Sequence, residues 1–268
     1  MTKQFKKLTD SQWLAISDIF IKPKRTLCLR AVVNALLYIV RTGCQWRNLP
    51  QEYPKWTAVN YYFECWKTDE TFERINIRLN EIYRQKEHRE STPSLICVDS
   101  QSVKLNPMIE KDRGIDGNKC VNGRKREYLV DTGGRLWVAV VDAANIADGK
   151  GALPLLDKLD GITERLEKFL GDTSYNKIFA NAVSKAGYVF EKSARFAEAD
   201  KSVEQPKKGK KFVVESKRWV VERSFAWTNR AAFRFFRRVT KDYERTVESS
   251  VAWLLLSNST IMLQRILK

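Results

Sequence analysis

The feature that most constrains the fold is a change in hydrophobic pattern near residue 91. Before it, apolar residues recur at helical spacing, and after it, short apolar runs typical of strands alternate with helical segments. The first such run, Leu95-Ile96-Cys97-Val98, follows Ser91-Thr92-Pro93-Ser94 and ends at Asp99. This order predicts an all-α domain over residues 1–91 and an α/β domain over residues 92–268.

The N-terminal region predicts several short helices. Thr9 and Gln12 have capping-box spacing and open a helix that ends before Pro23. A second helix is expected from about Thr26–Thr42, with Gly43 as its C-terminal stop. Two more are expected over residues 57–67 and 71–85. Short helices of this kind suit a helix-turn-helix-like DNA-binding module, although many small helical bundles share the pattern.

The second region predicts a mixed five-stranded sheet with flanking helices. Residues 107–126 are rich in glycine and basic side chains and are expected to form a loop. Strands are expected over residues 95–98, 128–130, 135–141, 167–170 and 188–192. Helices are expected over residues 149–159, 176–186, 215–236 and 243–266, with a basic linker over residues 200–211.

The charge balance points to a polyanionic partner. Lys and Arg number 48 against 32 acids, a net charge of +16. Residues 1–90 carry 16 basic and 10 acidic side chains, residues 91–200 carry 16 and 16, and residues 201–268 carry 16 and 6. Two positive segments therefore flank a neutral one. This favours nucleic-acid binding, with carboxylates held between basic surfaces, over a merely soluble basic surface.

Other classes of protein are disfavoured. The five cysteines include no C-x-x-C pair, so reduced thiols are expected rather than disulfides or a zinc knuckle. His88, the single histidine, lies in a polar run and is expected on the surface. The apolar run Ala31–Val40 is too short to span a bilayer, and the N-terminus lacks a secretory pattern. We therefore expect a cytoplasmic, nucleoid-associated protein without a membrane partner.

Three acids stand out by their positions. Asp99 closes the first expected strand, Asp172 follows a later strand, and Glu222 lies on an expected helix. Carboxylates from adjacent strand ends and a helix packed across them can converge on hard cations such as Mg²⁺. Two such ions would stabilise the attacking and leaving oxygens of a phosphodiester displacement. Spacing alone leaves a chance arrangement open, because the chain has 32 acids.

Neighbouring acids have competing interpretations. Asp142 is a rival ligand, because it follows an expected strand. Asp131 precedes Thr-Gly-Gly and is interpreted as a turn former, and Asp148 as a helix N-cap.

Glu222 lies in the string RWVVERSFAWTNR, residues 218–230. On a helix, Arg218 shares a face with Glu222, and Arg223 and Arg230 flank that face. The arginines suit bidentate contacts to phosphate beside a metal ligand. A structural ion-pair network is the alternative.

Motifs along most of the chain occur in the order found in a known family. They are ICVDSQSVK (96–104), DGNKCVNGRKREYLVDT (116–132), GDTSYN (171–176) and RWVVERSFAW (218–227), preceded by YIVRTGCQWRNLP (38–50) and YYFECWKTDETFERI (61–75). Together they resemble DDE transposases of bacterial insertion sequences, in the insertion-sequence-5-like branch.

The resemblance implies a ribonuclease-H-like catalytic domain in which Asp99, Asp172 and Glu222 are catalytic and bind two Mg²⁺ ions, with Mn²⁺ as a possible substitute. It implies DNA partners, namely the terminal inverted repeats and a target, with nicking at the ends followed by strand transfer. A homodimer in the synaptic complex is expected. The expected DNA-binding residues are Arg124, Lys125, Arg126, Arg218, Arg223, Arg230, Arg237 and Arg238.

Some positions depart from the family pattern. The signature Y-(2)-R-(3)-E-(6)-K is met at Arg218 and Glu222, but Glu215 replaces Tyr and Asn229 replaces Lys. Glu127 stands where His usually follows GRKR. These departures motivate an alternative, a catalytically impaired relic or regulator that occupies the element ends. A host nuclease of the same fold is a third hypothesis.

Overall fold

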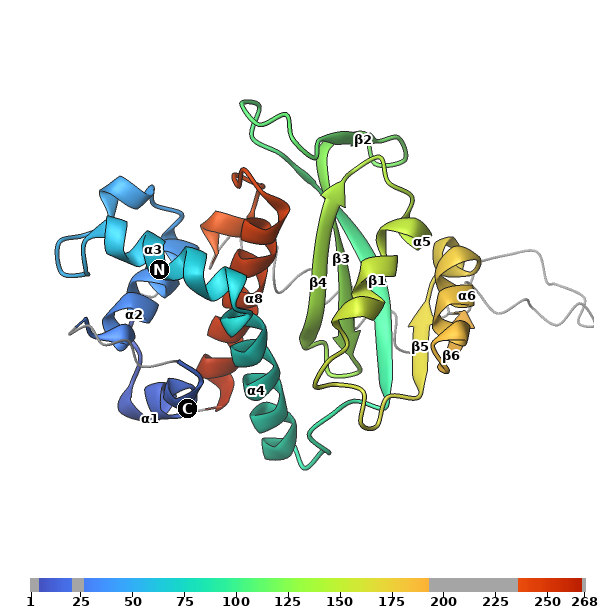
Figure 1. Cartoon of the computed structure of the whole chain (residues 1–268), viewed down its shortest axis with the longest axis horizontal. Helices are drawn as coiled ribbons and strands as arrows, with labels where there is room; N and C mark the ends of the chain where they lie inside the picture. The colour runs from blue at the N-terminus through green and yellow to red at the C-terminus, as the bar shows by residue number, and fades with distance from the viewer. Residues whose placement is uncertain (1–4, 21–26, 193–235, 267–268) are drawn as a thin grey trace, which may run out of the picture.

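The computed structural model describes residues 5–20, 27–192 and 236–266 (Figure 1). Its helices are α1 (Asp10–Leu14), α2 (Leu29–Thr42), α3 (Trp56–Thr68), α4 (Thr71–Lys86), α5 (Asp148–Gly151), α6 (Ile178–Lys185) and α8 (Val247–Ile266). Its strands are β1 (Leu95–Lys104), β2 (Gly114–Asp116), β3 (Val121–Asp131), β4 (Leu136–Ala143), β5 (Lys168–Gly171) and β6 (Val189–Lys192). Short 3₁₀ turns are η1 (Ser17–Ile19), η2 (Trp46–Asn48), η3 (Leu153–Lys158), η4 (Thr173–Tyr175) and η5 (Arg237–Val239).

The expected all-α N-terminal region is confirmed. Thr9 and Gln12 form the capping box at the start of α1, each side chain accepting from the other's backbone N–H. The helix is shorter than expected, because the chain changes to the 3₁₀ turn η1 after Leu14. Helix α2 ends at Gly43, whose φ of 70° is left-handed, as its C-terminal position requires.

The sheet has the expected mixed, ribonuclease-H-like arrangement. Strands β4, β3 and β1 are antiparallel neighbours, and β5 and β6 follow β1 in parallel, so the order across the sheet is β4-β3-β1-β5-β6. The described sheet has six strands instead of the expected five, because the three-residue β2 pairs with the start of β3. This addition lies at the upper end of the sheet in Figure 1.

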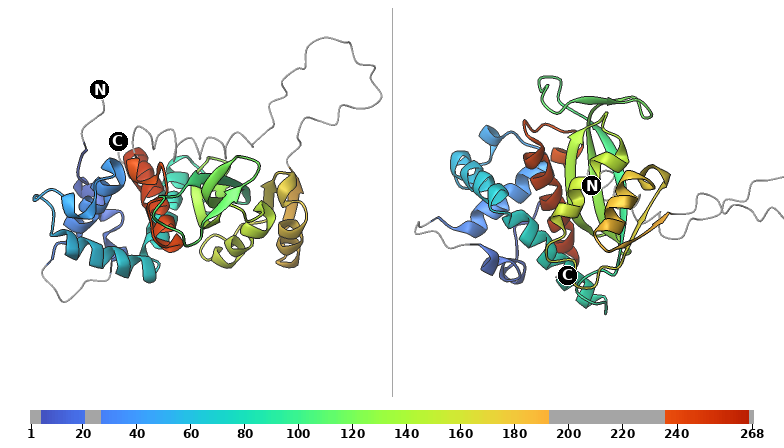
Figure 2. Two further views of the ribbon diagram at one scale, coloured as in Figure 1. Left: turned by 90° about the horizontal axis from the view of Figure 1, so that it is seen from above. Right: turned by 45° about the vertical axis from the view of Figure 1, so that its right-hand side comes forward.

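Two helical layers cover the faces of this sheet (Figure 2). Alternate β1 residues face opposite layers, as strand geometry requires. Cys97 packs in the cluster that contains α8 and the N-terminal helices, whereas Ile96 and Val98 pack against the cluster of α6 and η3. The two cores therefore fix which β1 side chains face each layer.

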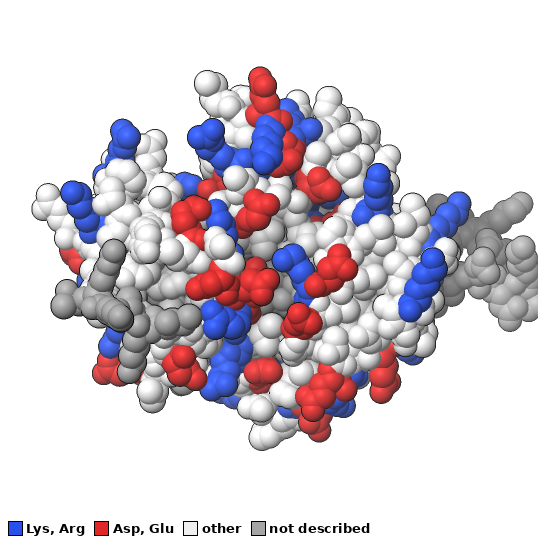
Figure 3. Space-filling view, in the orientation of Figure 1, with Lys and Arg blue, Asp and Glu red and all other residues white. Residues whose placement is uncertain are grey.

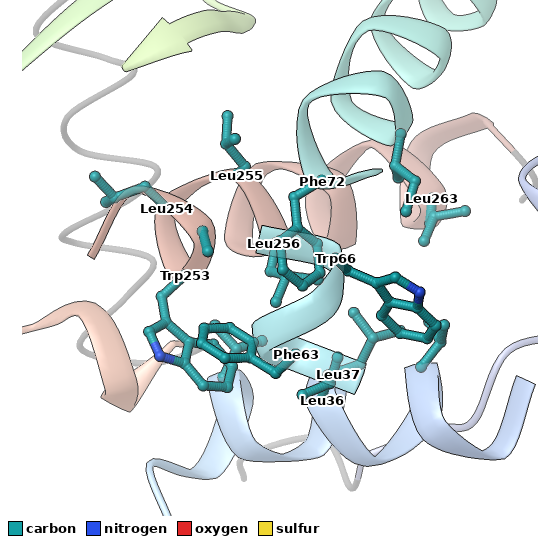
Figure 4. Close-up of a cluster of buried hydrophobic side chains, with 14 of the residues drawn as sticks. Leu36, Leu37, Phe63, Trp66, Phe72, Trp253, Leu254, Leu255, Leu256 and Leu263 are labelled. Carbon is teal, nitrogen blue, oxygen red and sulfur yellow. The ribbon is translucent and has the colours of Figure 1, made fainter. Parts of the chain in front are cut away.

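Helix α8 joins the N-terminal helices to the sheet, since it packs against α2, α4 and β4. The ring of Trp253 on α8 stacks on Phe63 of α3 with centroids 4.7 Å apart. Leu36 and Leu37 of α2 and Phe72 of α4 belong to the same buried cluster (Figure 4). One hydrophobic core thus spans both sides of the expected boundary at residue 91, and that boundary remains a prediction.

Two sequence expectations about the sheet were wrong. Strand β1 continues to Lys104 instead of ending at Asp99, because β3 pairs with its whole length. Residues 114–116 and 121–126, expected in a loop, belong to β2 and β3. The expected linker at 200–211 and helix at 215–236 lie outside the described residues, except for Phe236.

Candidate metal-binding site

Asp99 lies in the middle of β1 and is half-buried. Its Oδ1 atom accepts a 2.8 Å hydrogen bond from the backbone N–H of Ser100. Neighbouring side chains alternate, so Asp99 faces the same layer as Cys97. Pairing with β3 before, at and after Asp99 therefore fixes the direction of its carboxylate.

Asp172 directly follows β5 and caps the η4 turn. Its Oδ1 atom accepts hydrogen bonds from the backbone N–H of Ser174 at 2.7 Å and from the Ser174 hydroxyl at 2.5 Å. The backbone of Asp172 is still extended. This side chain is therefore held at the carboxyl end of β5.

The parallel pairing of β1 and β5 aligns the two aspartates. Cys97 pairs with Leu170, and continuing that register by two residues sets Asp99 opposite Asp172. Adjacent strands lie about 4.8 Å apart, so the two carboxylates start from neighbouring backbones and the same face of the sheet. This register favours the convergence of the Asp99 and Asp172 carboxylates, which stays a prediction.

Glu222, the third expected ligand, lies outside the described residues. Within the described ranges, no three His, Cys, Asp or Glu side chains form a group able to hold a metal ion. Asp99 and Asp172 offer only oxygen donors, which are the ligands that Mg²⁺ and Mn²⁺ prefer. The donor chemistry of the two described residues therefore fits a hard divalent cation.

Asp131 and Asp148 have interior partners that fit structural roles. Asp131 forms ion pairs with Arg84 and Arg135 and accepts the backbone N–H of Gly133, consistent with the expected turn. Asp148 is the first residue of α5, and its N-cap is Ala147, so the expected cap was wrong by one residue.

Asp142 remains the rival ligand. It is half-buried near the end of β4, and its Oδ1 atom accepts from the backbone N–H of Ala143. Strand β4 does not neighbour β5 in the sheet, so Asp142 lacks the register that aligns Asp99 with Asp172.

The sequence predicted that Arg124, Lys125 and Arg126 bind DNA. Their positions in the structure do not fit that role. All three lie in β3 and are buried, because this segment is a strand in the sheet instead of an exposed loop. Arg124 donates to the carbonyl of Glu244 at 2.8 Å, and Arg126 donates to that of Val239 at 2.9 Å. Both guanidiniums therefore anchor the C-terminal segment.

Lys125 faces the opposite layer. Its Nζ atom lies 2.6 Å from Asp148 Oδ1 and donates to the carbonyl of Ile146. Its charge is thus neutralised inside the protein, at the start of α5.

The other expected DNA-binding arginines differ in accessibility. Arg238 pairs with Glu244 at 2.6 Å and lies over the Trp253 ring, so it is engaged within the C-terminal region. Arg237 is exposed and suits a phosphate contact. Arg218, Arg223 and Arg230 lie outside the described residues.

The view in Figure 3 shows acidic and basic side chains interspersed over α4 and the centre of the molecule. A cavity of about 590 Å³ lies in this region and is lined by Glu73, Arg74, Trp137 and other side chains of both charges. Neither Asp99 nor Asp172 lines it. The cavity is therefore not part of the site that the two aspartates would form.

Sequence reasoning noticed Glu127 only as a departure from a motif. Its side chain is buried, and Glu127 Oε2 accepts a 2.8 Å hydrogen bond from the hydroxyl of Tyr175. The sequence would have indicated a buried Glu127 if the run Val121–Asp131, including its basic residues, had been interpreted as a strand.

Family comparison decides the class of protein. Residues 8–76 match the family model for transposases of the IS4/5 family, and residues 90–259 match the model described as the transposase DDE domain. The second match covers 170 of 268 residues, counted from 90 to 259. This chain belongs to the DDE transposase family. The resemblance to DDE transposases that the sequence motifs predicted is therefore confirmed.

Two solved structures give distant matches to this transposase. The Mos1 transposase paired-end complex with left transposon end is 13% identical, with a TM-score of 0.27, and the match covers 66% of this chain and 62% of that one. The Mos1 strand transfer complex is 14% identical, with a TM-score of 0.25, covering 66% and 61%. This chain thus spans about three fifths of the solved proteins' length, and these likenesses are too slight to place any residue. No curated protein matches the sequence. Among the described helices, none is long and apolar enough to cross a membrane.

Proposed function

We propose that this chain is an active, metal-dependent transposase that cleaves DNA at the ends of an insertion sequence and transfers the freed strand into target DNA. The observation that carries this proposal is the register of β1 and β5, which aligns Asp99 with Asp172. Membership of the DDE family and the excess of basic residues support it.

Asp99, Asp172 and Glu222 would hold two Mg²⁺ ions, with Mn²⁺ as a possible substitute. When bound, the ions would supply charge stabilisation for the attacking and leaving oxygens of the phosphodiester. The role of the chain itself is to fix the direction of its carboxylates. For Asp99 this comes from pairing with β3 before and after it, and for Asp172 from the hydrogen bonds of the η4 turn.

Terminal inverted repeats and target DNA are the proposed partners, with a homodimer holding two ends together. Arg237 is a described side chain exposed for phosphate contact, and Arg218, Arg223 and Arg230 are proposed to add to it. Each phosphate contact would release counterions, so binding is expected to weaken steeply as salt rises. Such a protein would work on DNA in the cytoplasm.

The test compares the full chain with Asp99→Asn and Asp172→Asn on plasmid DNA that carries the sequences flanking the coding region. With Mg²⁺, the parent is expected to nick this DNA at the element ends, and EDTA abolishes the reaction. Each variant is expected to nick DNA about 100-fold or more slowly than the parent. Loss of a group that only orients a metal ligand already costs about 10- to 100-fold, and loss of the ligand itself should cost at least as much.

Asp142→Asn tests the rival ligand and is expected to nick DNA as the parent does, because β4 does not neighbour β5 in the sheet. Equal nicking by Asp99→Asn and the parent would contradict the assignment. Salt-sensitive binding to the ends without cleavage by the parent would favour the regulator. Cleavage without end specificity or joining would favour a host nuclease.

A further inference from the structure

Glu127 is a buried carboxylate beneath the proposed site. It lies on β3 opposite Ser100 of β1, the residue after Asp99, and is 1% exposed. Its Oε2 atom accepts the 2.8 Å hydrogen bond from Tyr175, whereas Oε1 has no hydrogen-bond partner among the described residues. A Cβ atom added at Gly151 of α5 would lie 3.2 Å from Oε1, so the α5 turn closes over this carboxylate.

Tyr175 belongs to the same turn as Asp172. Its backbone N–H donates to the Asp172 carbonyl at 3.2 Å, and the Asp172 carboxylate accepts from Ser174 between them. The Tyr175 side chain is fully buried, and its ring meets Phe179 edge-on with centroids 5.8 Å apart. The η4 turn therefore has the half-buried Asp172 at one end and the buried Tyr175 at the other.

The hydroxyl of Tyr175 forms a directional hydrogen bond with Glu127, which the ring alone could not form. A phenylalanine ring could fill the same apolar space, but burying a carboxylate and a hydroxyl is costly unless they bond to each other. The bond joins the turn after β5 to β3, two strands away across β1. It thus bridges the strand that carries Asp99 and holds the turn that carries Asp172.

A second polar link supports β1 from the same layer. The Ser100 hydroxyl lies 3.1 Å from Asp148 Oδ1, which also pairs with Lys125 at 2.6 Å. The Ser100 backbone N–H is the group that bonds to Asp99. Both aspartates therefore have a buried polar support on the opposite face of the sheet.

We propose that Tyr175 and Glu127 are positioning residues that set the Asp172 carboxylate against Asp99 for divalent cation binding. This inference rests on the proposed function, because it takes these two aspartates as metal ligands. Groups that orient metal ligands commonly change metal affinity by about 10- to 100-fold when removed.

The test measures Mn²⁺ binding to the full chain by calorimetry and by the loss of the free-ion electron paramagnetic resonance signal, without DNA. Tyr175→Phe is expected to weaken Mn²⁺ binding about 10-fold. Glu127→Gln keeps an oxygen that accepts from the hydroxyl, so it is expected to bind Mn²⁺ as the parent does. Tyr188→Phe is the matched control, because Tyr188 packs against the same cluster but lies outside the η4 turn.

The double variant Tyr175→Phe/Glu127→Met keeps the test decisive if Tyr175→Phe does not fold. It removes both polar partners together, which preserves stability better than leaving one unpaired. The double variant is expected to show the same 10-fold weakening. Parent-like Mn²⁺ affinity in a folded variant that lacks the tether would overturn the proposal.

Asp172→Asn separates this proposal from the proposed function. If Asp172→Asn loses Mn²⁺ binding while the tether variants keep it, the positioning role is wrong and the metal site stands. If Asp172→Asn binds Mn²⁺ as the parent does, the metal site is wrong and the positioning role falls with it.

Discussion

Arg84 of α4 donates a 2.6 Å hydrogen bond to Asp131 Oδ2 at the end of β3, and both side chains are almost fully buried. Arg135 donates to the same oxygen at 2.7 Å. Burial alone raises the pKa of Asp131, but the two guanidiniums outweigh it and lower that pKa below its ordinary value. An ionised carboxylate thus joins the N-terminal helices to the β3–β4 hairpin.

Asp131→Asn is expected to destabilise the protein by about 3–5 kcal/mol at neutral pH, because it leaves the buried Arg84 guanidinium without its countercharge and Arg135 with only Glu87. Urea unfolding measures this. A lowered pKa gives stability that is present above the ordinary aspartate pKa and is lost as the pH falls through the folded value. The difference between parent and variant should therefore shrink in acid. Asp10→Asn, at an exposed pair with Arg30, should change stability by less than about 1 kcal/mol.

Arg124→Met is expected to affect folding instead of DNA contact. Its guanidinium is fully buried, lies 3.3 Å from Asp242 and donates to the carbonyls before α8. Its loss should cost about 3–5 kcal/mol, since Asp242 stays buried. The folded variant should keep the parent's salt dependence of DNA binding. Arg237→Ala, at an exposed position, should reduce the steepness with which the logarithm of the DNA-binding constant falls against the logarithm of the salt concentration, by about 0.9. An equal drop in slope for Arg124→Met would contradict the interior role.

Residues 124–126 show why part of the fold could not be predicted from the sequence, since they were expected in a loop and lie in β3. Glycines and clustered charges favour a loop, but β3 runs through this segment because β1 and β4 pair on its two sides. Its charges are tolerated inside because partners far along the chain, such as Asp242, neutralise them. Such partners depend on tertiary contacts that local periodicity does not encode. The places of Asp99 and Asp172 at neighbouring strands were predictable, because each follows or interrupts a short apolar run that the sequence displays, and their role as ligands stays a prediction.

Gly43→Ala is expected to destabilise the protein by about 1–2 kcal/mol, because φ of 70° is left-handed and disfavoured with a Cβ. A Cβ atom there would also lie 2.9 Å from Cβ of Arg237, which packs η5 against the end of α2. Urea unfolding again measures the change. Gly117→Ala is the matched control, with nothing within 4 Å of an added Cβ, and should be nearly neutral. Equal effects at both glycines would contradict this account.

Glu127→Gln is expected to make stability less sensitive to alkali. Burial raises the pKa of Glu127 well above its ordinary value; the Tyr175 hydrogen bond and Lys125 oppose this, and Asp148 and Asp99 add to it. The folded protein thus keeps a proton that the unfolded chain releases above the ordinary glutamate pKa, so stability falls as the pH rises towards the folded pKa.

Glutamine carries no such proton, so the stability of Glu127→Gln relative to the parent should grow by up to about 1.4 kcal/mol per pH unit in this range. Urea unfolding from pH 5 to 8 at constant salt measures the difference. Glu52→Gln, on a surface side chain paired with Lys7, should give a difference that stays constant with pH. If Glu127→Gln also gave a constant difference, Glu127 would be ionised in the folded protein. The buried hydroxyl of Tyr175 would then be bonded to a charge, a stronger tether than one to a neutral acid.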